Sequence, residues 1–317
     1  MLDEPSLMEL GWNSFFKGQL ESAAVTGSQV PGRVVENQRT HLTVMYESGI
    51  TEIPITGRWY KDATPNPPVV GDWVLLDIQK NTLISIFDRQ NMVQRTLSQN
   101  EQIQVIAANV ETLFLVTSCN SEFSLSRLTR YLILALESGA KPVVVITKRD
   151  LCEDPRRFVR QAENLNADVA VRLVNALDIE SLSSLSAWLV PGKTIGLLGS
   201  SGVGKSTLVN TLVGQRSQQT GEVRHKDDKG RHTTTHRSLH LIPDGGLIID
   251  SPGMRELGIS HVEHGLATMF SDIVDISTRC QFSDCCHRTE PNCAVIKAVL
   301  DGRLDQTRLD LYRTFKG

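Results

Sequence analysis

The 317-residue chain is 40% hydrophobic and 22% charged, with a formal net charge of −3. This balance excludes wholesale disorder and fibrous repeats, and the length predicts two or three domains. The apolar runs fall far short of the roughly 18 residues needed to span a bilayer. The first residues lack the basic start and apolar core of a secretion signal, so we expect a cytoplasmic protein with no membrane partner.

Residues 30–105 contain short extended segments separated by glycine or proline, a spacing typical of a small β-barrel. Residues 1–29 are predicted to form a short helical piece and a loose lead-in. On these features alone, a docking barrel without a ligand and a nucleic-acid-binding barrel are both supported. Residues 1–110 carry 8 basic and 12 acidic side chains, so binding of RNA by the barrel would require a local basic face.

From about residue 111 strands alternate with helices, which predicts a doubly wound α/β sheet. The expected strands are 112–117, 142–146, 169–174 and 194–198. The expected helices are 124–137, 156–164, 179–189 and 205–212. Residues 239–242 and 247–249 flank a Pro-Asp-Gly-Gly turn and are predicted to form an antiparallel pair, with one strand at the edge of the sheet.

A glycine-rich segment at 199–206 fits the P-loop pattern, with a predicted strand before it and a helix after it. Its glycines let backbone N–H groups surround a phosphate at the N-terminus of the helix. Lys205 is placed to bridge the β and γ oxygens, and Ser206 to ligate Mg²⁺. The predicted phosphate-binding residues are Gly199, Ser200, Ser201, Gly202, Val203, Gly204, Lys205, Ser206 and Thr207.

Two other strand ends carry residues that recognise the rest of a nucleotide. Asp250 ends an apolar strand, where its carboxylate can reach Mg²⁺, and Gly253 can offer its N–H to the γ-phosphate. In Thr147-Lys148-Arg149-Asp150, the Asp150 carboxylate can accept hydrogen bonds from N1–H and N2–H₂ of guanine, a donor pair that adenine lacks. Lys148 would lie over the base plane. The sequence therefore predicts GTP as the nucleotide.

These segments resemble the signature elements of small GTPases in a permuted order. Base recognition at 147–150 precedes the phosphate loop at 199–206, switch I at 230–237 and switch II at 250–253. With the barrel before them and a cysteine cluster after them, the chain resembles the RsgA (YjeQ) family of ribosome-biogenesis GTPases over about residues 30–300. Further matching stretches are Gly71-Asp72-Trp73-Val74, Ala107-Ala108-Asn109-Val110, Arg130-Tyr131-Leu132, Gly230-Arg231-His232-Thr233-Thr234-Thr235 and Asp250-Ser251-Pro252-Gly253-Met254-Arg255-Glu256.

The resemblance implies a Mg²⁺-dependent GTPase, binding GTP and GDP, whose N-terminal OB-fold contacts rRNA of the small ribosomal subunit. It also implies that the immature subunit stimulates hydrolysis and that the protein leaves after late maturation. Thr147 stands where asparagine is common, and Asn175-Ala176 stands where Ser-Ala usually brings a backbone N–H to guanine O6. Both departures can weaken guanine discrimination, whereas Ala176 and Asp150 retain the principal contacts. No dimer seam is visible, and we expect a monomer.

Met254 follows the switch II glycine, where many GTPases carry a glutamine that orients the attacking water. A thioether cannot hydrogen-bond water usefully, so another group must act. His232 is our candidate for positioning or deprotonating the water, and the resemblance favours the same residue; a solvated loop histidine is the competing interpretation. Thr234 is predicted to complete Mg²⁺ coordination, with Thr233 and Thr235 as competitors. The basic segment 215–240 is equally consistent with a mobile switch loop and an RNA contact.

Near the C-terminus, Cys280, Cys285, His287 and Cys293 form a Cys-x₄-Cys-x-His-x₅-Cys pattern. Three thiolates and an imidazole make a closed tetrahedral set, which predicts one structural Zn²⁺. The resemblance selects these four residues, whereas spacing alone leaves open whether Cys286 replaces Cys285. A helical module this short commonly needs a metal to hold its fold.

Three domains follow from these patterns: 1–105 as lead-in and OB-like barrel, 106–265 as the permuted GTPase, and 266–317 as the zinc-binding module. The leading hypothesis is a GTP-hydrolysing assembly factor for the small ribosomal subunit. A P-loop ATPase or metabolite kinase is an alternative, which the Thr-Lys-x-Asp segment opposes. A second alternative is an RNA-binding scaffold in which the nucleotide is structural and is not hydrolysed.

Overall fold

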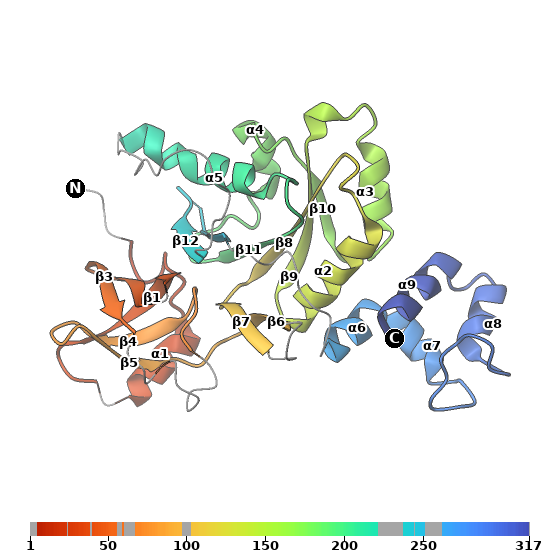
Figure 1. Cartoon of the computed structure of the whole chain (residues 1–317), viewed down its shortest axis with the longest axis horizontal. Helices are drawn as coiled ribbons and strands as arrows, with labels where there is room; N and C mark the ends of the chain where they lie inside the picture. Colours follow the sequence, from red (N-terminus) through yellow and green to blue (C-terminus); the bar gives the residue numbers. More distant parts are fainter. Residues whose placement is uncertain are drawn as a thin grey trace.

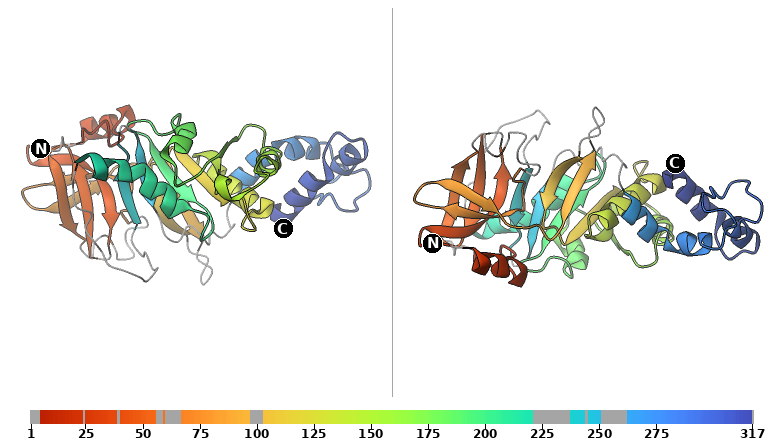
Figure 2. Two further views of the ribbon diagram at one scale, coloured as in Figure 1. Left: turned by 90° about the horizontal axis from the view of Figure 1, so that it is seen from above. Right: turned by 90° about the horizontal axis from the view of Figure 1, so that it is seen from below.

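The structure is a computed structural model whose described parts form three bodies in a row: a strand-rich body, a sheet covered by helices, and a helical body (Figures 1 and 2). None of the described helices is both long and apolar enough to cross a bilayer. The described residues are 5–23, 25–38, 40–55, 59, 67–96, 103–220, 237–243, 245–250 and 262–316.

The strand-rich body is the predicted OB-like barrel, which is confirmed. Its strands pair in the order β5-β4-β1-β2-β3, and β3 lies beside β5. They are β1 (Gln29–Asn37), β2 (His41–Tyr46), β3 (Gly49–Pro54), β4 (Trp73–Asp77) and β5 (Thr82–Ile86). Alternate residues point inward, as a pleated strand requires, and fill the barrel with fully buried aliphatic side chains such as Val34, Leu42 and Ile53.

The N-terminal segment is more ordered than the loose lead-in that we expected. Helix α1 (Ser14–Ser22) begins where the side chain of Asn13 accepts a hydrogen bond from the N–H of Phe15, a common N-cap. Leu10 and Phe16 are fully buried. Trp12 packs edge-on against Trp73 of β4, with ring centroids 4.7 Å apart. Apolar burial and aromatic packing therefore fix this segment to the barrel.

The central sheet confirms the doubly wound prediction. Its order is β10-β9-β8-β11-β13-β12, with β12 antiparallel to β13 and the other strands parallel. The strands are β8 (Thr112–Ser118), β9 (Lys141–Thr147), β10 (Ala170–Leu173), β11 (Thr194–Leu198), β12 (Arg237–Leu241) and β13 (Leu247–Asp250).

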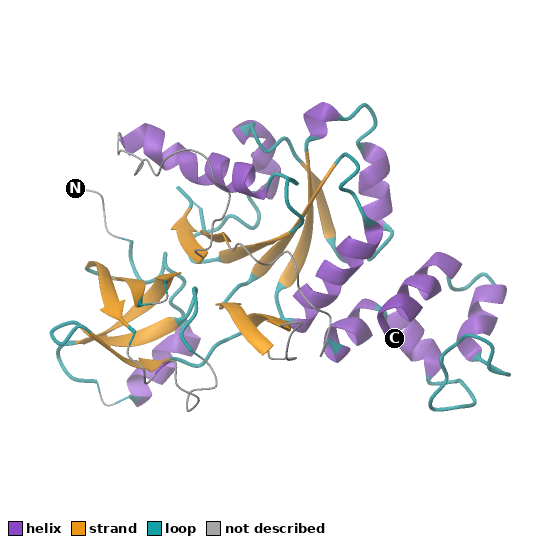
Figure 3. Ribbon diagram, in the orientation of Figure 1, coloured by secondary structure: helices purple, strands orange, loops and turns teal. Residues whose placement is uncertain are grey.

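Helices cover both faces of this sheet (Figure 3). Leu113 and Leu115 of β8 pack with α2 (Leu125–Glu137) and α3 (Arg156–Glu163). Phe114 and Val116 pack on the opposite side with α4 (Ile179–Leu182) and α5 (Lys205–Thr220). Successive residues of β8 thus pack into different cores on the two faces of the sheet. This explains why the buried strands are continuous apolar runs in the sequence.

Several elements differ from the sequence prediction. The expected helix 179–189 is only α4 followed by a 3-10 turn (Ser183–Leu185). The hydroxyl of Ser184 bonds the carbonyl oxygen of Ser181, and serines that bond nearby backbone in this way compete with regular helix. Helix α5 is longer than expected. A separate hairpin, β6 (Met92–Thr96) and β7 (Ile103–Ala108), follows the barrel.

Strand β12 was predicted to lie at a sheet edge, and this was wrong because the barrel strand β1 pairs with it. Glu36 of β1 lies opposite Ser238, and Asn37 lies opposite Arg237. A bulge between Val34 and Glu36 lies where β1 leaves its pairing with β4 and meets β12. Such bulges bend a strand, so the bulge lets β1 pair with β4 of the barrel and then with β12 of the central sheet.

The helical body docks on the central one through α6 (Glu263–Met269). A Cβ at Gly265 would lie 2.2 Å from the carbonyl oxygen of Ile133 in α2, so only glycine permits this approach. The guanidinium group of Arg308 donates hydrogen bonds to the carboxylate of Asp272 and to the carbonyl oxygens of Leu165 and Met269. The other helices are α7 (Ser271–Ser277), α8 (Ala294–Leu300) and α9 (Gln306–Lys316). The predicted domain boundaries, after residues 105 and 265, fall inside β7 and α6 and stay a prediction.

Arg33 of β1 is 1% exposed and joins the first two bodies. Its Nη2 donates to the Asn109 carbonyl oxygen at 3.1 Å and to Thr194 Oγ1 at 2.8 Å, both in the central body. Its Nη1 donates to the carbonyl oxygen of Leu10, and Nε donates to that of Gly71 at 3.3 Å. Burial lowers the pKa of Arg33 to about 10, so it remains charged at neutral pH. Each of the three nitrogens of this buried guanidinium group therefore donates a hydrogen bond.

Replacing Arg33 with methionine is expected to lower the free energy of unfolding by about 3–5 kcal/mol, because several buried acceptors lose their donor. Urea unfolding followed by tryptophan fluorescence measures this change. Lys17→Met, at a side chain that is 68% exposed, serves as the control and should change stability by less than about 0.5 kcal/mol. Equal stabilities of the two variants would contradict the role given to Arg33.

Candidate nucleotide-binding site and metal centre

The carboxyl ends of the parallel strands meet at one edge of the central sheet. Strands β8 and β11 are neighbours, and the helices that follow them, α2 and α5, pack on opposite faces of the sheet. Such a position is a topological switch point, which is where open α/β sheets bind their ligands. The predicted phosphate loop follows β11, the Thr-Lys-x-Asp segment follows β9, and Asn175-Ala176 follows β10. Asp250 ends β13. The fold thus brings four sequence-predicted segments to one edge.

The phosphate loop turns tightly against β8. A Cβ at Gly199 would lie 2.4 Å from the carbonyl oxygen of Val116, so this position requires glycine. Lys205 is the first residue of α5, and its Nζ donates to the carbonyl oxygens of Gly199 at 2.6 Å and Ser200 at 2.5 Å. The ammonium group is therefore held by the loop that would surround the phosphates.

Thr147 links the phosphate loop to the base-recognition loop. Its side chain is fully buried, and Oγ1 lies 3.0 Å from the carbonyl oxygen of Thr117 and 2.5 Å from that of Val203. Lys148 then adopts a left-handed conformation (φ +58°), and Asp150 lies exposed in the 3-10 turn Arg149–Leu151. The threonine thus holds the phosphate loop against the end of β9, the strand that leads into the turn with Asp150.

The Asn175-Ala176 loop is fixed on both sides. Asn175 Oδ1 accepts a hydrogen bond from the N–H of Leu177 at 3.0 Å, the turn contact that a serine would also provide. Thr211 of α5 donates to the carbonyl oxygen of Ala176 at 2.8 Å. No described residue accepts a hydrogen bond from the Ala176 N–H. Asparagine therefore preserves the turn that serine would make in this loop.

Asp250 has polar neighbours that sequence reasoning missed. Ser238 lies directly opposite it on β12, and Ser238 Oγ is 2.7 Å from Nε2 of His240. Burial lowers the pKa of His240, and the carboxylates of Asp250 and Glu36 oppose this shift. The available signal was the polar pair at positions i and i+2 of a strand, which places both side chains on one face.

The remaining predicted residues of this site, His232, Thr234 and Gly253, lie outside the described residues, as do Thr233, Thr235 and Met254. Their roles in switch I and switch II stay predictions.

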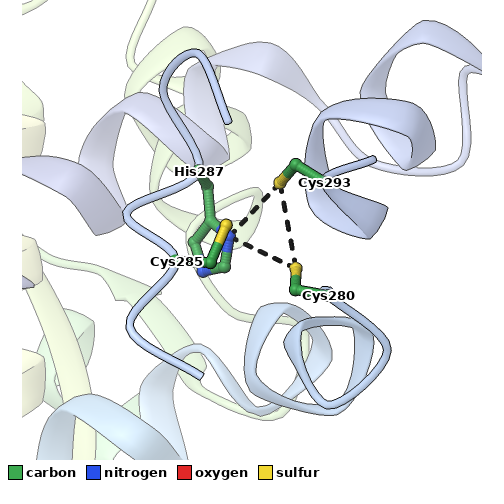
Figure 4. Close-up of side chains that lie close together, drawn as sticks. All are labelled: Cys280, Cys285, His287 and Cys293. Carbon is green, nitrogen blue, oxygen red and sulfur yellow. Dashed lines mark hydrogen bonds between the residues drawn. The ribbon is translucent and has the colours of Figure 1, made fainter. Parts of the chain in front are cut away.

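The four predicted zinc ligands come together, with one ligand atom of each within 4.8 Å of the others (Figure 4). The Sγ atoms of Cys280 and Cys293 are 3.8 Å apart, and Nδ1 of His287 is 3.6 and 3.4 Å from them. A tetrahedral Zn²⁺ site requires about 3.8 Å between sulfurs and about 3.5 Å between sulfur and nitrogen. The donor set and its spacing therefore fit zinc.

The spacing of the cysteines left two candidates for one position, and the structure distinguishes them. Cys285 is buried in the cluster, whereas the side chain of Cys286 is exposed. The carboxylate of Glu290 accepts hydrogen bonds from the N–H groups of Cys286, Arg288 and Thr289. Hydrogen bonds from backbone N–H groups, first that of Glu290 itself and then those of Arg288 and Cys286, lower the pKa of Glu290 to about 2. Glu290 thus stabilises the loop that carries His287, and the sequence analysis did not predict this role.

Taken together, the sheet order, the phosphate loop and a base-recognition segment that precedes it in the chain define a circularly permuted P-loop GTPase fold. The family model described as RsgA GTPase matches residues 86–260. The chain belongs to this family.

Individual relatives extend the match over nearly the whole chain. The small ribosomal subunit biogenesis GTPase RsgA of Mesorhizobium japonicum is 44% identical over 312 residues, covering 98% of this chain and 88% of that protein. RsgA 2 of Vibrio vulnificus is 44% identical over 308 residues, covering 97% of this chain and 86% of that protein.

Two solved structures are also similar. The crystal structure of YjeQ from Thermotoga maritima has a TM-score of 0.65 at 26% identity and covers 91% of this chain and 98% of that one. YloQ, described as a circularly permuted GTPase, has a TM-score of 0.65 at 28% identity and covers 92% of this chain and 96% of that one.

The zinc site can be tested by replacing neighbouring cysteines. Cys285→Ser is expected to lower the zinc content from one ion per chain, measured by elemental analysis, and to lower the melting temperature, because one ligand of a closed site is lost. Cys286→Ser is the matched control and should retain both. If the two variants lose zinc equally, the assignment of Cys285 is wrong.

Proposed function

We propose that this chain hydrolyses GTP and acts in the cytoplasm as an assembly factor for late maturation of the small ribosomal subunit. The observation that carries this proposal is the placement of the phosphate loop and the Thr-Lys-x-Asp segment at the same edge of one sheet, after strands β11 and β9, which are separated only by β8. The similarity to proteins named small ribosomal subunit biogenesis GTPase supports the biological role.

The guanine nucleotide is assigned to the edge formed by β9, β10 and β11. In this proposal Asp150 accepts hydrogen bonds from guanine N1–H and N2–H₂, and the N–H of Ala176 meets O6. Support for the second contact comes from the loop itself, because Thr211 holds the carbonyl group of Ala176. Lys205 and the backbone N–H groups of 199–204 bind the phosphates.

Ser206 and Asp250 would hold Mg²⁺, together with Thr234. Hydroxyl and carboxylate oxygens are ligands that Mg²⁺ prefers, and the ion bridges phosphate oxygens and neutralises developing charge. Ser206 is the second residue of α5, and Asp250 ends β13, the strand that pairs with β11, which supports this pairing. His232 is proposed to position or deprotonate the attacking water.

The proposed partner is the small ribosomal subunit with its rRNA, bound by a monomer. Two basic side chains of the barrel are not available for phosphate contacts. Arg33 is buried between the barrel and the central sheet, and Arg89 forms a nearly buried ion pair with Asp72. Contacts to phosphate would therefore depend on other basic side chains, among them the exposed Lys17 and Lys80. Zn²⁺ is assigned a structural role in the helical body.

The decisive assay measures GTP hydrolysis with and without purified small subunits. We expect slow turnover alone, marked stimulation by subunits, and loss of both in Lys205→Ala, because that variant lacks the ammonium group at the phosphates. Competition by excess ATP should have no effect. Equal competition by ATP would favour the ATPase or kinase alternative, and no turnover even with subunits would favour the scaffold.

The catalytic assignment has a separate test. His232→Ala is expected to bind GTP normally and to hydrolyse it at least about 100-fold more slowly in the presence of subunits, since it loses a group that acts on the water. His264→Ala, at an exposed histidine of α6, is the control. Normal hydrolysis by His232→Ala would remove this residue from the mechanism.

A further inference from the structure

A cleft lies between the central body and the helical body. One wall is formed by Leu136 of α2, by Pro142 near the start of β9, and by residues of the loop 166–169, which precedes β10. Residues of α6 and α7 form the other wall. The cleft is thus at the amino ends of β9 and β10, the edge of the sheet opposite the one that carries the phosphate loop. Its volume of about 540 Å³ is sufficient for a small organic molecule.

Polar contacts hold the two walls of this cleft in place. Beside α2, the carboxylate of Glu137 accepts a hydrogen bond from the N–H of Gly265 in α6 at 2.6 Å. Beside the loop that precedes β10, Asn166 Nδ2 lies 3.8 Å from the sulfur of Met269, and Arg308 donates to carbonyl oxygens of both bodies. A ligand would therefore enter a cleft whose walls are already ordered, which lowers the entropic cost of binding.

Part of the lining is apolar and comes from both walls. The central body contributes Leu136, Pro142 and Val169, and the helical body contributes Ala267. Val169 is buried, and Leu136 and Pro142 are half-buried. A ligand that covers these side chains would remove their remaining apolar surface from water, which favours binding of a molecule with a hydrocarbon or aromatic body.

The polar part of the lining contains a single charge, the carboxylate of Asp168. This side chain is exposed, and no described lysine, arginine or histidine forms an ion pair with it. Asn166 is already engaged, because its Oδ1 accepts a hydrogen bond from the N–H of Asp168 at 2.9 Å and its Nδ2 faces Met269. The exposed hydroxyl groups of Thr268 and Ser271 lie on the other wall. The cleft thus offers an anionic acceptor, two hydroxyl groups and apolar surface.

We infer that this cleft binds a small organic amine, with its ammonium group at the Asp168 carboxylate and its apolar body against the apolar side chains of both walls. An ammonium group carries three donors and no acceptor, so it can also donate to hydroxyl oxygens such as those of Thr268 and Ser271. The hydrogen bond to the carboxylate is charge-assisted and is the strongest of these contacts. Because the ligand contacts both bodies, its binding stabilises the docking of the helical body.

The test uses the full-length protein and benzylamine, which is protonated at neutral pH, with binding followed by methyl NMR. We expect saturable shifts of the methyl signals of Leu136, Val169 and Ala267, which lie in the cleft. Benzyl alcohol has the same ring without the charge and should bind the wild-type protein about 10-fold more weakly or less, because it cannot form the charge-assisted contact.

Three variants locate the binding and its charge. Asp168→Asn should weaken benzylamine binding about 10-fold or more and leave benzyl alcohol binding nearly unchanged. Asp154→Asn, at an exposed aspartate that precedes α3, is the matched control and should bind both molecules as the wild type does. Ala267→Leu should prevent binding of both, because the larger side chain fills the cleft. If Ala267→Leu does not fold, Asp168→Asn and its control decide alone.

Unchanged benzylamine affinity in Asp168→Asn would overturn the inference, as would equal binding of amine and alcohol by the wild-type protein. Shifts confined to signals outside the cleft, or the absence of saturable shifts, would also overturn it. The experiment contains no nucleotide, so its outcome is independent of whether the chain hydrolyses GTP.

Discussion

One buried cation, Arg33, sets the relative position of the barrel and the nucleotide-binding sheet. It reaches the N-terminal segment through Leu10, the barrel through Gly71, and the base of β11 through Thr194. An unpaired guanidinium at this depth would be very costly, so the three segments must keep their positions for the cation to remain satisfied. Strand β11 leads directly into the phosphate loop, which is therefore built on the same junction.

Much of this architecture was predictable because local patterns and tertiary structure agree. The strand 194–198 and the α2 helix follow from apolar periodicity, and the zinc ligands follow from spacing and residue type. The pairing of β1 with β12 was not predictable, since Glu36 and Ser238 are about 200 positions apart and neither is apolar. The assignment of Cys285, and not Cys286, as the fourth ligand likewise depends on burial. Burial cannot be read from the sequence when two adjacent residues are identical.

The order of the chain determines which bodies the predicted switch segments connect. Because the Thr-Lys-x-Asp segment precedes the phosphate loop, the chain after Asp250 leads into α6 and the helical body. That helix is fixed on α2 by the close approach at Gly265, and β13 is fixed in the sheet. The barrel joins the same sheet through β12. The described elements that flank the two predicted switch segments, β12 and β13 in the sheet and α6 on α2, are therefore all packed in the fold.

The barrel and the sheet should form one cooperative unit around Arg33, and native-state hydrogen exchange tests this most directly. The N–H of Gly71 bonds the carbonyl oxygen of Val34, and the N–H of Ala108 bonds that of Val70. We predict that these junction amides exchange with the same free energy of opening as the amides of β8. Exchange of the junction amides at a much lower free energy, while β8 stays protected, would show that the barrel opens independently and would contradict the claim.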